Sequence, residues 1–292
     1  IAVCVWGWAP ALLWVVLGSI FIGGIHDLGS VVCSVREDGL SVGDVALRAI
    51  SQKAKLVMSI FTFFALTLVV AVFAYLAADT FVKEPSIVIP SLGLIPLAMA
   101  VGFALYHLKW PLAPVTAIAL AAIGLMIILG HRFPVALSGN SLNAWMVILL
   151  IYCYFASITP VNILLQPRDY LCSFLLFAGV LIAFAGILIS HPTINTPAFI
   201  AHKTSQGYLW PMMFITIACG AVSGFHSLVA SGTTSKQIGN ERDAKRIGFG
   251  GMLMEGFVAV IVILLVTGGF TLAEFNRHIA DQTSPVNMYG FG

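Results

Sequence analysis

Eight long runs of apolar residues limit what this chain can fold into more than any other feature of its sequence. The runs cover residues 2–25, 56–78, 87–106, 111–130, 142–165, 170–190, 208–230 and 247–270. A bilayer core about 30 Å thick is crossed by roughly 20 apolar residues of helix, so each run is long enough to span it. Six runs contain neither a charged residue nor a histidine, and the other two contain His226 and Glu255.

The composition excludes a water-soluble globule. Hydrophobic residues make up 60% of the chain and charged residues only 9%, against about 25% charged in soluble domains. The apolar excess must therefore face lipid, where every backbone polar group has to be satisfied within a helix. We predict an all-α, polytopic transmembrane bundle of about eight spans, forming a single domain over residues 1–292. Because the chain begins at Ile1 without a methionine, we expect it to be a fragment of a longer pattern.

Lysine and arginine in the loops predict the orientation. Loops after the odd-numbered spans contain 10 of these residues, and the even loops with the C-terminal tail contain 4. Cytoplasmic loops carry the excess of positive charge, so the odd loops are expected in the cytoplasm.

Residues 41–50 show helical spacing of apolar residues, with Ser41 and Asp44 as a capping box. We expect a short helix over about residues 41–54, lying on the cytoplasmic surface.

Segment 208–230 is the strongest candidate for a solute-binding segment. Gly220 and Gly224 form a small-xxx-small step, which is common where helices pack closely. With Ser223 and Ser227 beside them, they also fit a helix that breaks and frees backbone groups for a solute. Both interpretations remain open, and the second makes Gly220, Ser223, Gly224 and Ser227 candidate solute contacts.

Ionisable residues inside the apolar runs are candidates for proton coupling or gating. Glu255 is eight residues into its run, where a carboxylate is costly and rarely faces lipid. His226 lies at a similar depth from the same surface, so the two side chains can reach each other. His226 also fits an ordinary interfacial histidine. His26 and Asp27 follow a Gly23-Gly24 kink, where they either anchor the end of the first span or form a gate or proton relay.

The fifth run contains a second candidate break. Thr159 precedes Pro160, which removes a backbone hydrogen bond; the result is a tolerated kink or a discontinuity beside the solute path. Ser157, Thr159 and Asn162 are the candidate contacts there, and Asn162 is expected to lie deep in the span. Arg168 and Asp169, in a short loop over 166–170, are expected to form a structural or gating ion-pair network, or simply to be solvated.

Motifs of known enzymes and of nucleic-acid binding are missing from the sequence. There is no H-E-x-x-H, G-x-S-x-G, P-loop or G-x-G-x-x-G, and no basic face for nucleic acid. We expect no catalytic residue, metal or cofactor. Two alternatives stay open. One is an intramembrane metal-dependent enzyme or sensor that uses His26, Asp27, His226 and Glu255, and the other is a channel-like or scaffold subunit.

Several stretches resemble the carbon starvation protein A (CstA) family, in order and at similar spacing along nearly the whole chain. These stretches are Gly24-Ile25-His26-Asp27, Ser34 through Gly39, Leu165 through Leu171, Phe214 through Thr234 and Gly248 through Gly256. The family usually has a His-His and Gly-Pro-rich helix before the position of Ile1 and continues past Gly292. Both parts are missing here.

The resemblance implies a proton-coupled secondary transporter of the cell inner membrane that takes up small peptides or pyruvate. It also implies a fold related to the amino acid–polyamine–organocation transporters, with inverted repeats. The expected partners are the small-molecule solute, protons and membrane lipid, with no nucleic acid. Which solute is carried, whether sodium replaces the proton, and the oligomeric state stay open.

Overall fold

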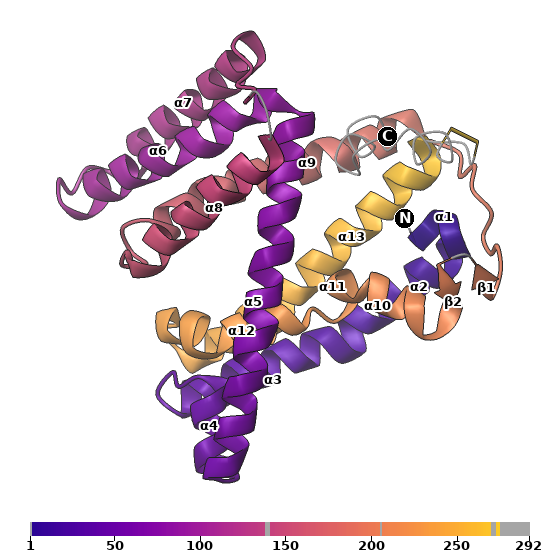
Figure 1. The fold of residues 1–292 in the computed structure, drawn as a ribbon, viewed down its shortest axis with the longest axis horizontal. Helices are drawn as coiled ribbons and strands as arrows, with labels where there is room; N and C mark the ends of the chain where they lie inside the picture. The colour runs from indigo at the N-terminus through magenta and orange to yellow at the C-terminus, as the bar shows by residue number, and fades with distance from the viewer. Residues whose placement is uncertain (1, 138–140, 205, 270–272, 275–292) are drawn as a thin grey trace. The chain divides into compact units, whose positions relative to one another are not determined.

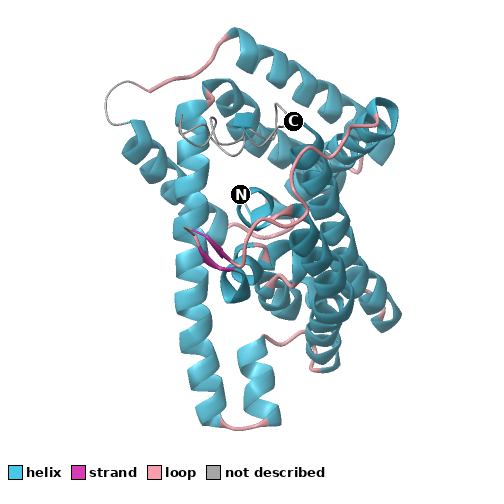
Figure 2. Ribbon diagram, turned by 90° about the vertical axis from the view of Figure 1, so that its right-hand side faces the viewer, coloured by secondary structure: helices cyan, strands magenta, loops and turns pink. Residues whose placement is uncertain are grey.

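The computed structural model describes residues 2–137, 141–204, 206–269 and 273–274. Within these ranges, seven helical stretches are long and apolar enough to cross a membrane. They are Trp8–Arg36, Gln52–Lys83, Pro85–Tyr106, Leu112–Arg132, Ser141–Ile158, Leu165–Ser190 and Glu241–Gly269. Figure 2 shows that helices make up nearly all of the described chain. The prediction of an all-α polytopic membrane protein is confirmed, with seven such stretches where eight spans were expected.

The chain divides into two compact units, which are described separately. Unit 1 consists of residues 1–65 and 183–292, and unit 2 of residues 66–182. Helices α5 (Gln52–Lys83) and α9 (Leu165–Ser190) each cross from one unit into the other. The candidate residues His26, Asp27, His226 and Glu255 all lie in unit 1.

Unit 1 begins with α1 (Ala2–Trp6) and a longer helical stretch made of α2 (Trp8–Gly18), a π-helical turn η1 (Ser19–Gly23) and α3 (Gly24–Arg36). The predicted end of the first span at residue 25 is wrong. The extra residue of the π turn is accommodated within the helix, so the Gly23-Gly24 pair does not end it. Asp27 therefore lies inside a continuous helix and is buried, whereas it was expected at a wet helix terminus.

The short helix α4 spans Val42–Ala49. The Ser41 hydroxyl accepts the Asp44 backbone N–H at 3.3 Å, as the capping box predicts. The helix ends before residue 54, because Ile50 leaves the helical conformation and the Ser51 hydroxyl accepts the Ala54 N–H at the start of α5. Its position on the membrane surface stays a prediction.

Unit 2 contains a helical hairpin of α6 (Val88–Tyr106) and α7 (Leu112–Arg132), which lie side by side in Figure 1. A 3-10 turn, η2 (Pro85–Ile87), precedes it. At 19 and 21 residues, both helices are long enough to cross the bilayer. The hairpin packs around a buried apolar cluster of Leu94, Val101, Val115, Ala119, Ile123 and Leu171.

Helix α8 (Ser141–Ile158) stops just before Thr159-Pro160. Proline disfavours helical geometry in the residue before it and has no N–H to donate, so the predicted continuation to residue 165 is wrong. Asn162 was expected deep in this span, but it lies exposed in the turn between α8 and α9. Arg168 and Asp169 belong to the first turns of α9, not to a loop. Pro167 fits there because the first N–H groups of a helix have no partner within it.

The predicted span 208–230 is not one helix. A short antiparallel strand pair, β1 (Lys203–Thr204) and β2 (Gly207–Tyr208), leads into it. Four short pieces follow: η3 (Leu209–Met213), α10 (Phe214–Thr216), α11 (Ala218–Ala221) and α12 (Gly224–Val229). The backbone leaves helical geometry at Ile217 and again at Val222 and Ser223, where Ser223 takes the left-handed conformation (φ 34°, ψ 78°). The helix is thus broken, and Gly220 also packs closely against α13 (Gly250–Gly269), so the two interpretations do not exclude each other; the solute contacts stay a prediction.

Short turns connect α12 to the last long helix. They are η4 (Ala230–Thr234), η5 (Ser235–Gln237), η6 (Glu241–Asp243) and η7 (Lys245–Phe249), and α13 (Gly250–Gly269) follows. Helices α13, α11 and the first helical stretch pack closely at glycines. A Cβ on Gly256 would lie 2.7 Å from the Ser19 hydroxyl oxygen, and one on Gly220 would lie 2.9 Å from the Ala259 Cβ. This close packing brings polar side chains of three helices together.

Candidate functional site

A histidine between two carboxylates forms the centre of the candidate site. His226 Nδ1 lies 3.0 Å from Asp27 Oδ2, and His226 Nε2 lies 2.8 Å from Glu255 Oε2. The three residues come from α12, α3 and α13. We call them the carboxylate–histidine triad. The His226–Glu255 contact that the sequence made possible is present, and Asp27 extends it to a third helix.

Asp27 is the most buried member of the triad, with 4% of its side chain exposed. Its Oδ1 atom accepts no hydrogen bond from the described residues. His26 Nδ1 lies 3.6 Å from this Oδ1 atom, and the His26 side chain is 44% exposed. A buried carboxylate oxygen is costly without a partner, so Asp27 is suited to take up a proton.

The broken backbone of the segment 217–229 places His226. The left-handed Ser223 ends the preceding piece, and its carbonyl accepts the His226 N–H at 3.0 Å at the start of α12. The Ser30 hydroxyl then donates to the Ser227 carbonyl at 2.6 Å and ties α12 to α3. The Ser227 hydroxyl donates to the Gly224 carbonyl at 3.1 Å. Here Ser223, Gly224 and Ser227 therefore support the backbone that holds the histidine.

The triad can hold a variable number of protons. A neutral imidazole has one N–H and donates to one carboxylate, whereas an imidazolium donates to both. With the ring charged and both carboxylates ionised, the triad carries a net charge of −1, and one more proton makes it neutral. Since Asp27 and Glu255 lie in helical stretches long and apolar enough to span a membrane, each change of charge alters the interactions of the triad with the surrounding helices.

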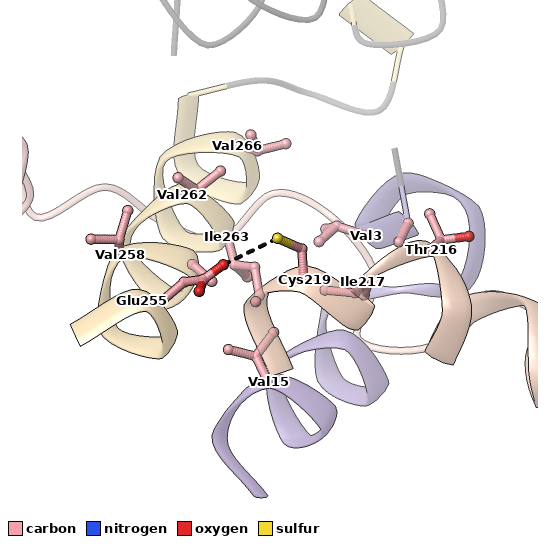
Figure 3. Close-up of a pocket in the computed structure, with 13 residues that line it drawn as sticks. Val3, Val15, Thr216, Ile217, Cys219, Glu255, Val258, Val262, Ile263 and Val266 are labelled. Carbon is pink, nitrogen blue, oxygen red and sulfur yellow. Dashed lines mark hydrogen bonds between the residues drawn. The ribbon is translucent and has the colours of Figure 1, made fainter. Parts of the chain in front are cut away.

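A cavity of about 510 Å³ lies on the other side of Glu255. Figure 3 shows Glu255 and Cys219 pointing toward each other there, and the Cys219 thiol donates to Glu255 Oε1 at 3.2 Å. The other lining residues are almost all aliphatic: Ala2, Val3, Val15, Thr216, Ile217, Gly220, Val258, Ala259, Val262, Ile263 and Val266. Of the predicted solute contacts in the broken segment, Gly220 lines this cavity.

Cys219 was not among the candidate residues that the sequence analysis singled out. The signal available was its place in the small-residue run of the broken segment, just before Gly220. Among the described residues, no group of three or more His, Cys, Asp and Glu has an arrangement that could hold a metal ion.

The candidates of unit 2 have local partners. Ser157 donates to the Tyr154 carbonyl at 2.7 Å and Thr159 to the Phe155 carbonyl at 2.8 Å, so both hydroxyls bond the preceding helical turn. Arg168 donates to the Tyr152 hydroxyl at 3.2 Å. No ion pair within 4.0 Å joins it to Asp169 among the residues described, and the gating role of the two stays a prediction. The solute path through Ser157, Thr159 and Asn162 stays a prediction.

Comparisons with known proteins agree on one family. The family model described as "Carbon starvation protein CstA" matches residues 1–281. The chain is 34% identical to the peptide transporter CstA of Escherichia coli K12, over 88% of this chain and 38% of that protein. It is 33% identical to the peptide transporter CstA of Mycobacterium tuberculosis H37Rv, over 97% of this chain and 40% of that protein.

A third relative, the pyruvate/proton symporter BtsT of Escherichia coli K12, is 29% identical over 97% of this chain and 40% of its own length. The chain thus spans about two fifths of the length of these relatives, all of which are named as transporters. No solved structure matches the chain, so the predicted inverted-repeat fold stays a prediction. With seven helical stretches able to span a membrane, the chain is a multi-pass protein of the inner membrane, and it belongs to the carbon starvation protein CstA family.

Proposed function

We propose that this chain is part of a secondary active transporter that takes up small peptides or pyruvate-like carboxylates together with protons. In this proposal the protein acts as a transporter and not as an enzyme. The names of its relatives, two peptide transporters and a pyruvate/proton symporter, support this proposal. The proposed partners are the solute, protons and lipid. We further propose that residues 1–292 act within one transporter domain, with α4 on the cytoplasmic surface.

The observation that carries the proposal is the carboxylate–histidine triad inside the helices of unit 1. Two ionisable carboxylates and an imidazole are expensive within a membrane and mark proton pathways in pumps and transporters. Glu255 lines a cavity, and the broken segment holds His226. Non-helical backbone at membrane depth is tolerated where it lines a cavity or is buried in protein, and transporters use such breaks for binding.

The coupling follows from charge. When the triad takes up a proton, its charge changes, and with it the contacts that join α3, α12 and α13. A proton that binds one state of these helices more tightly shifts the protein toward that state. Ser157, Thr159 and Asn162 of unit 2 are proposed as further solute contacts, Arg168 and Asp169 as gating residues, and His26 as a group that passes protons to Asp27.

The test is uptake by proteoliposomes that contain the full-length protein. Labelled pyruvate and labelled di- and tripeptides are offered with an inward proton gradient, with a sodium gradient and with neither. We expect saturable uptake that the proton gradient drives and that a protonophore abolishes. Turnover of the solute without accumulation would indicate an enzyme, and non-saturable flux would indicate a channel. Saturable uptake that does not depend on the proton gradient would contradict the proton coupling.

A further inference from the structure

The cavity beside Glu255 has one charged end and a long aliphatic wall. On α13, the lining residues follow Glu255 at helical spacing: Val258, Ala259, Val262, Ile263 and Val266. This stripe extends over eleven positions, or about 16 Å at 1.5 Å per residue. The facing wall comes from α1, α2 and the broken segment, and includes Val3, Val15 and Ile217. At about 510 Å³, the cavity falls within the range of small-molecule sites.

Few polar groups in the cavity are available to a ligand. The Thr216 hydroxyl already donates to the Met212 carbonyl of its own helical turn at 2.8 Å. This leaves the Glu255 carboxylate and the Cys219 thiol as the polar side chains of the lining. Glu255 Oε2 faces His226, whereas Oε1 faces only the thiol, at 3.2 Å. Because a thiol is a weak hydrogen-bond donor, a stronger donor would displace it from Oε1.

The charge of this end favours one kind of ligand. The described residues of the lining include no lysine, arginine or histidine, and the adjoining triad carries a net negative charge when its carboxylates are ionised. A ligand carboxylate placed in the cavity would meet Glu255 without a cationic partner, at a high cost in an apolar site. An ammonium group would instead pair with Oε1 and make a charge-assisted hydrogen bond.

We infer that this cavity is a subsite for a ligand that combines an ammonium group with an aliphatic side chain, as the N-terminal residue of a peptide does. Glu255 Oε1 binds the ammonium group, and the valines and isoleucines of α13 and α2 enclose the side chain. The inference rests on the proposed transport function and deepens it, because it favours peptides with an aliphatic first residue over 2-oxo acids at this site.

Binding to the purified full-length protein in detergent tests the subsite without transport. Three probes share the same branched side chain: L-leucinamide, which has an ammonium group; N-acetyl-L-leucinamide, which is uncharged; and 4-methyl-2-oxopentanoate, which has a carboxylate. Isothermal titration should show L-leucinamide binding at least about tenfold more tightly than the other two. It should also bind at least about tenfold more tightly than glycinamide, which lacks the side chain. Equal binding of the charged and acetylated amides, or no binding of L-leucinamide, overturns the inference.

Two variants test the two ends of the subsite. Glu255→Gln should remove the preference for L-leucinamide over its acetylated form, and Asp79→Asn, a carboxylate outside the cavity, should keep it. Ala259→Leu fills the cavity and should weaken L-leucinamide binding about tenfold while glycinamide binding stays unchanged. Ala71→Leu, on an exposed face of α5, is its matched control. A variant that keeps the wild-type preferences at either end overturns the assignment of that end.

Uptake by proteoliposomes separates this inference from the function on which it rests. Leu-Ala and N-acetyl-Leu-Ala are offered under the same proton gradient. Uptake of Leu-Ala in clear preference to the acetylated form supports both. Equal uptake of the two leaves the transporter in place and overturns the ammonium subsite. Selective binding of L-leucinamide without uptake of any peptide supports the subsite and contradicts the peptide transport.

Discussion

The imidazole of His226 and the carboxylate of Glu255 meet at 2.8 Å between α12 and α13, and the other ring nitrogen of His226 faces Asp27. The ring therefore joins a short helix, held at a backbone break, to two long helices. Removal of a proton from the ring leaves it with a donor for only one carboxylate. We therefore propose that protonation of the ring is linked to the position of α12.

The first prediction concerns this link. His226→Gln keeps a polar side chain but removes the titratable ring, so an inward proton gradient should no longer drive solute accumulation. The loss should amount to about tenfold or more in gradient-driven uptake, the scale of a coupling energy between two sites. Exchange of labelled for unlabelled solute without a gradient should persist. A pH-sensitive dye inside the vesicles measures proton entry, and His107→Gln, in the turn after α6, is the control. Unchanged proton entry with His226→Gln would contradict the proposed role of His226 in proton coupling.

The second prediction concerns the pH dependence of the capping box of α4. The Asp44 carboxylate lies 2.7 Å from Lys55 Nζ and 2.8 Å from the Ser41 hydroxyl. Both contacts lower the pKa of Asp44 below its usual value, and the contact with Lys55 has the larger effect. Since the folded-state pKa is lower than the unfolded one, the stabilising contact is present at neutral pH. It is lost as the pH falls through the folded-state pKa.

Carbon-13 NMR of labelled aspartate carboxyls in micelles measures this directly. The Asp44 midpoint should lie below that of an exposed aspartate, and Lys55→Gln should raise it toward the usual pKa. Lys53→Gln, two positions away, should leave it within about 0.3 units, since charges exposed to water interact weakly. If Lys55→Gln does not change the midpoint of the Asp44 pH titration, the ion pair between Asp44 and Lys55 is refuted.

The sequence was sufficient to predict a helical membrane protein and part of the candidate site. Apolar runs longer than a bilayer is thick can only be helices in lipid, so the spans follow from length and composition. The sequence showed that a contact of His226 with Glu255 was possible, because the two residues lie a similar number of positions from the same membrane surface. The capping box of Ser41 and Asp44 was readable because it depends on neighbours in the chain.

The buried environment of Asp27 could not be read in the same way. Gly23-Gly24 is a signal that usually ends or kinks a helix, and nothing local indicates that a π-helical turn carries the helix through it. The burial of Asp27 comes from α12 and η7, which are distant in sequence. The breaks at Ile217 and Ser223 also depend on packing against α2 and α13. At Thr159-Pro160 the local signal was the better guide. The proline ends α8 at Ile158, whereas the run of apolar residues had predicted a helix that continues to residue 165.

The third prediction concerns Ser34, a fully buried hydroxyl that links α3 to the turns after α12. Its oxygen lies 2.6 Å from the Leu40 carbonyl and 2.8 Å from the Ser235 hydroxyl, and it accepts the Gly232 N–H at 3.2 Å. Ser34→Ala removes all three contacts: the Leu40 carbonyl loses this donor, while the Gly232 N–H keeps its hydrogen bond to the Ser235 hydroxyl at 3.0 Å. It should destabilise the protein by about 1–3 kcal/mol, measured by thermal unfolding in detergent.

The matched control for Ser34→Ala is Ser190→Ala. Ser190 is exposed, and its hydroxyl donates to the Gly186 carbonyl of its own helix at 2.7 Å. Both changes delete one hydroxyl from a long helix, but only Ser34 connects separate segments. Ser190→Ala should change the stability by less than about 0.5 kcal/mol. Equal effects of the two would mean that the Ser34 contacts do not hold the turns after α12 to α3.

The last prediction tests the close approach of α13 to the first helical stretch, on which the position of Glu255 depends. A Cβ on Gly256 would lie 2.7 Å from Ser19 Oγ and 2.8 Å from Ser19 Cβ, whereas one on Gly251 meets no atom within 4 Å. Gly256→Ala should therefore destabilise the protein by about 1–3 kcal/mol through overpacking. Gly251→Ala, in the same helix, should be neutral or stabilising, because alanine is the better helix former. Ser19→Gly makes room for the new methyl group, so the double variant should regain most of the loss in thermal unfolding. If Ser19→Gly and Gly256→Ala are simply additive, the two helices do not meet at this point, and Glu255 is held in some other way.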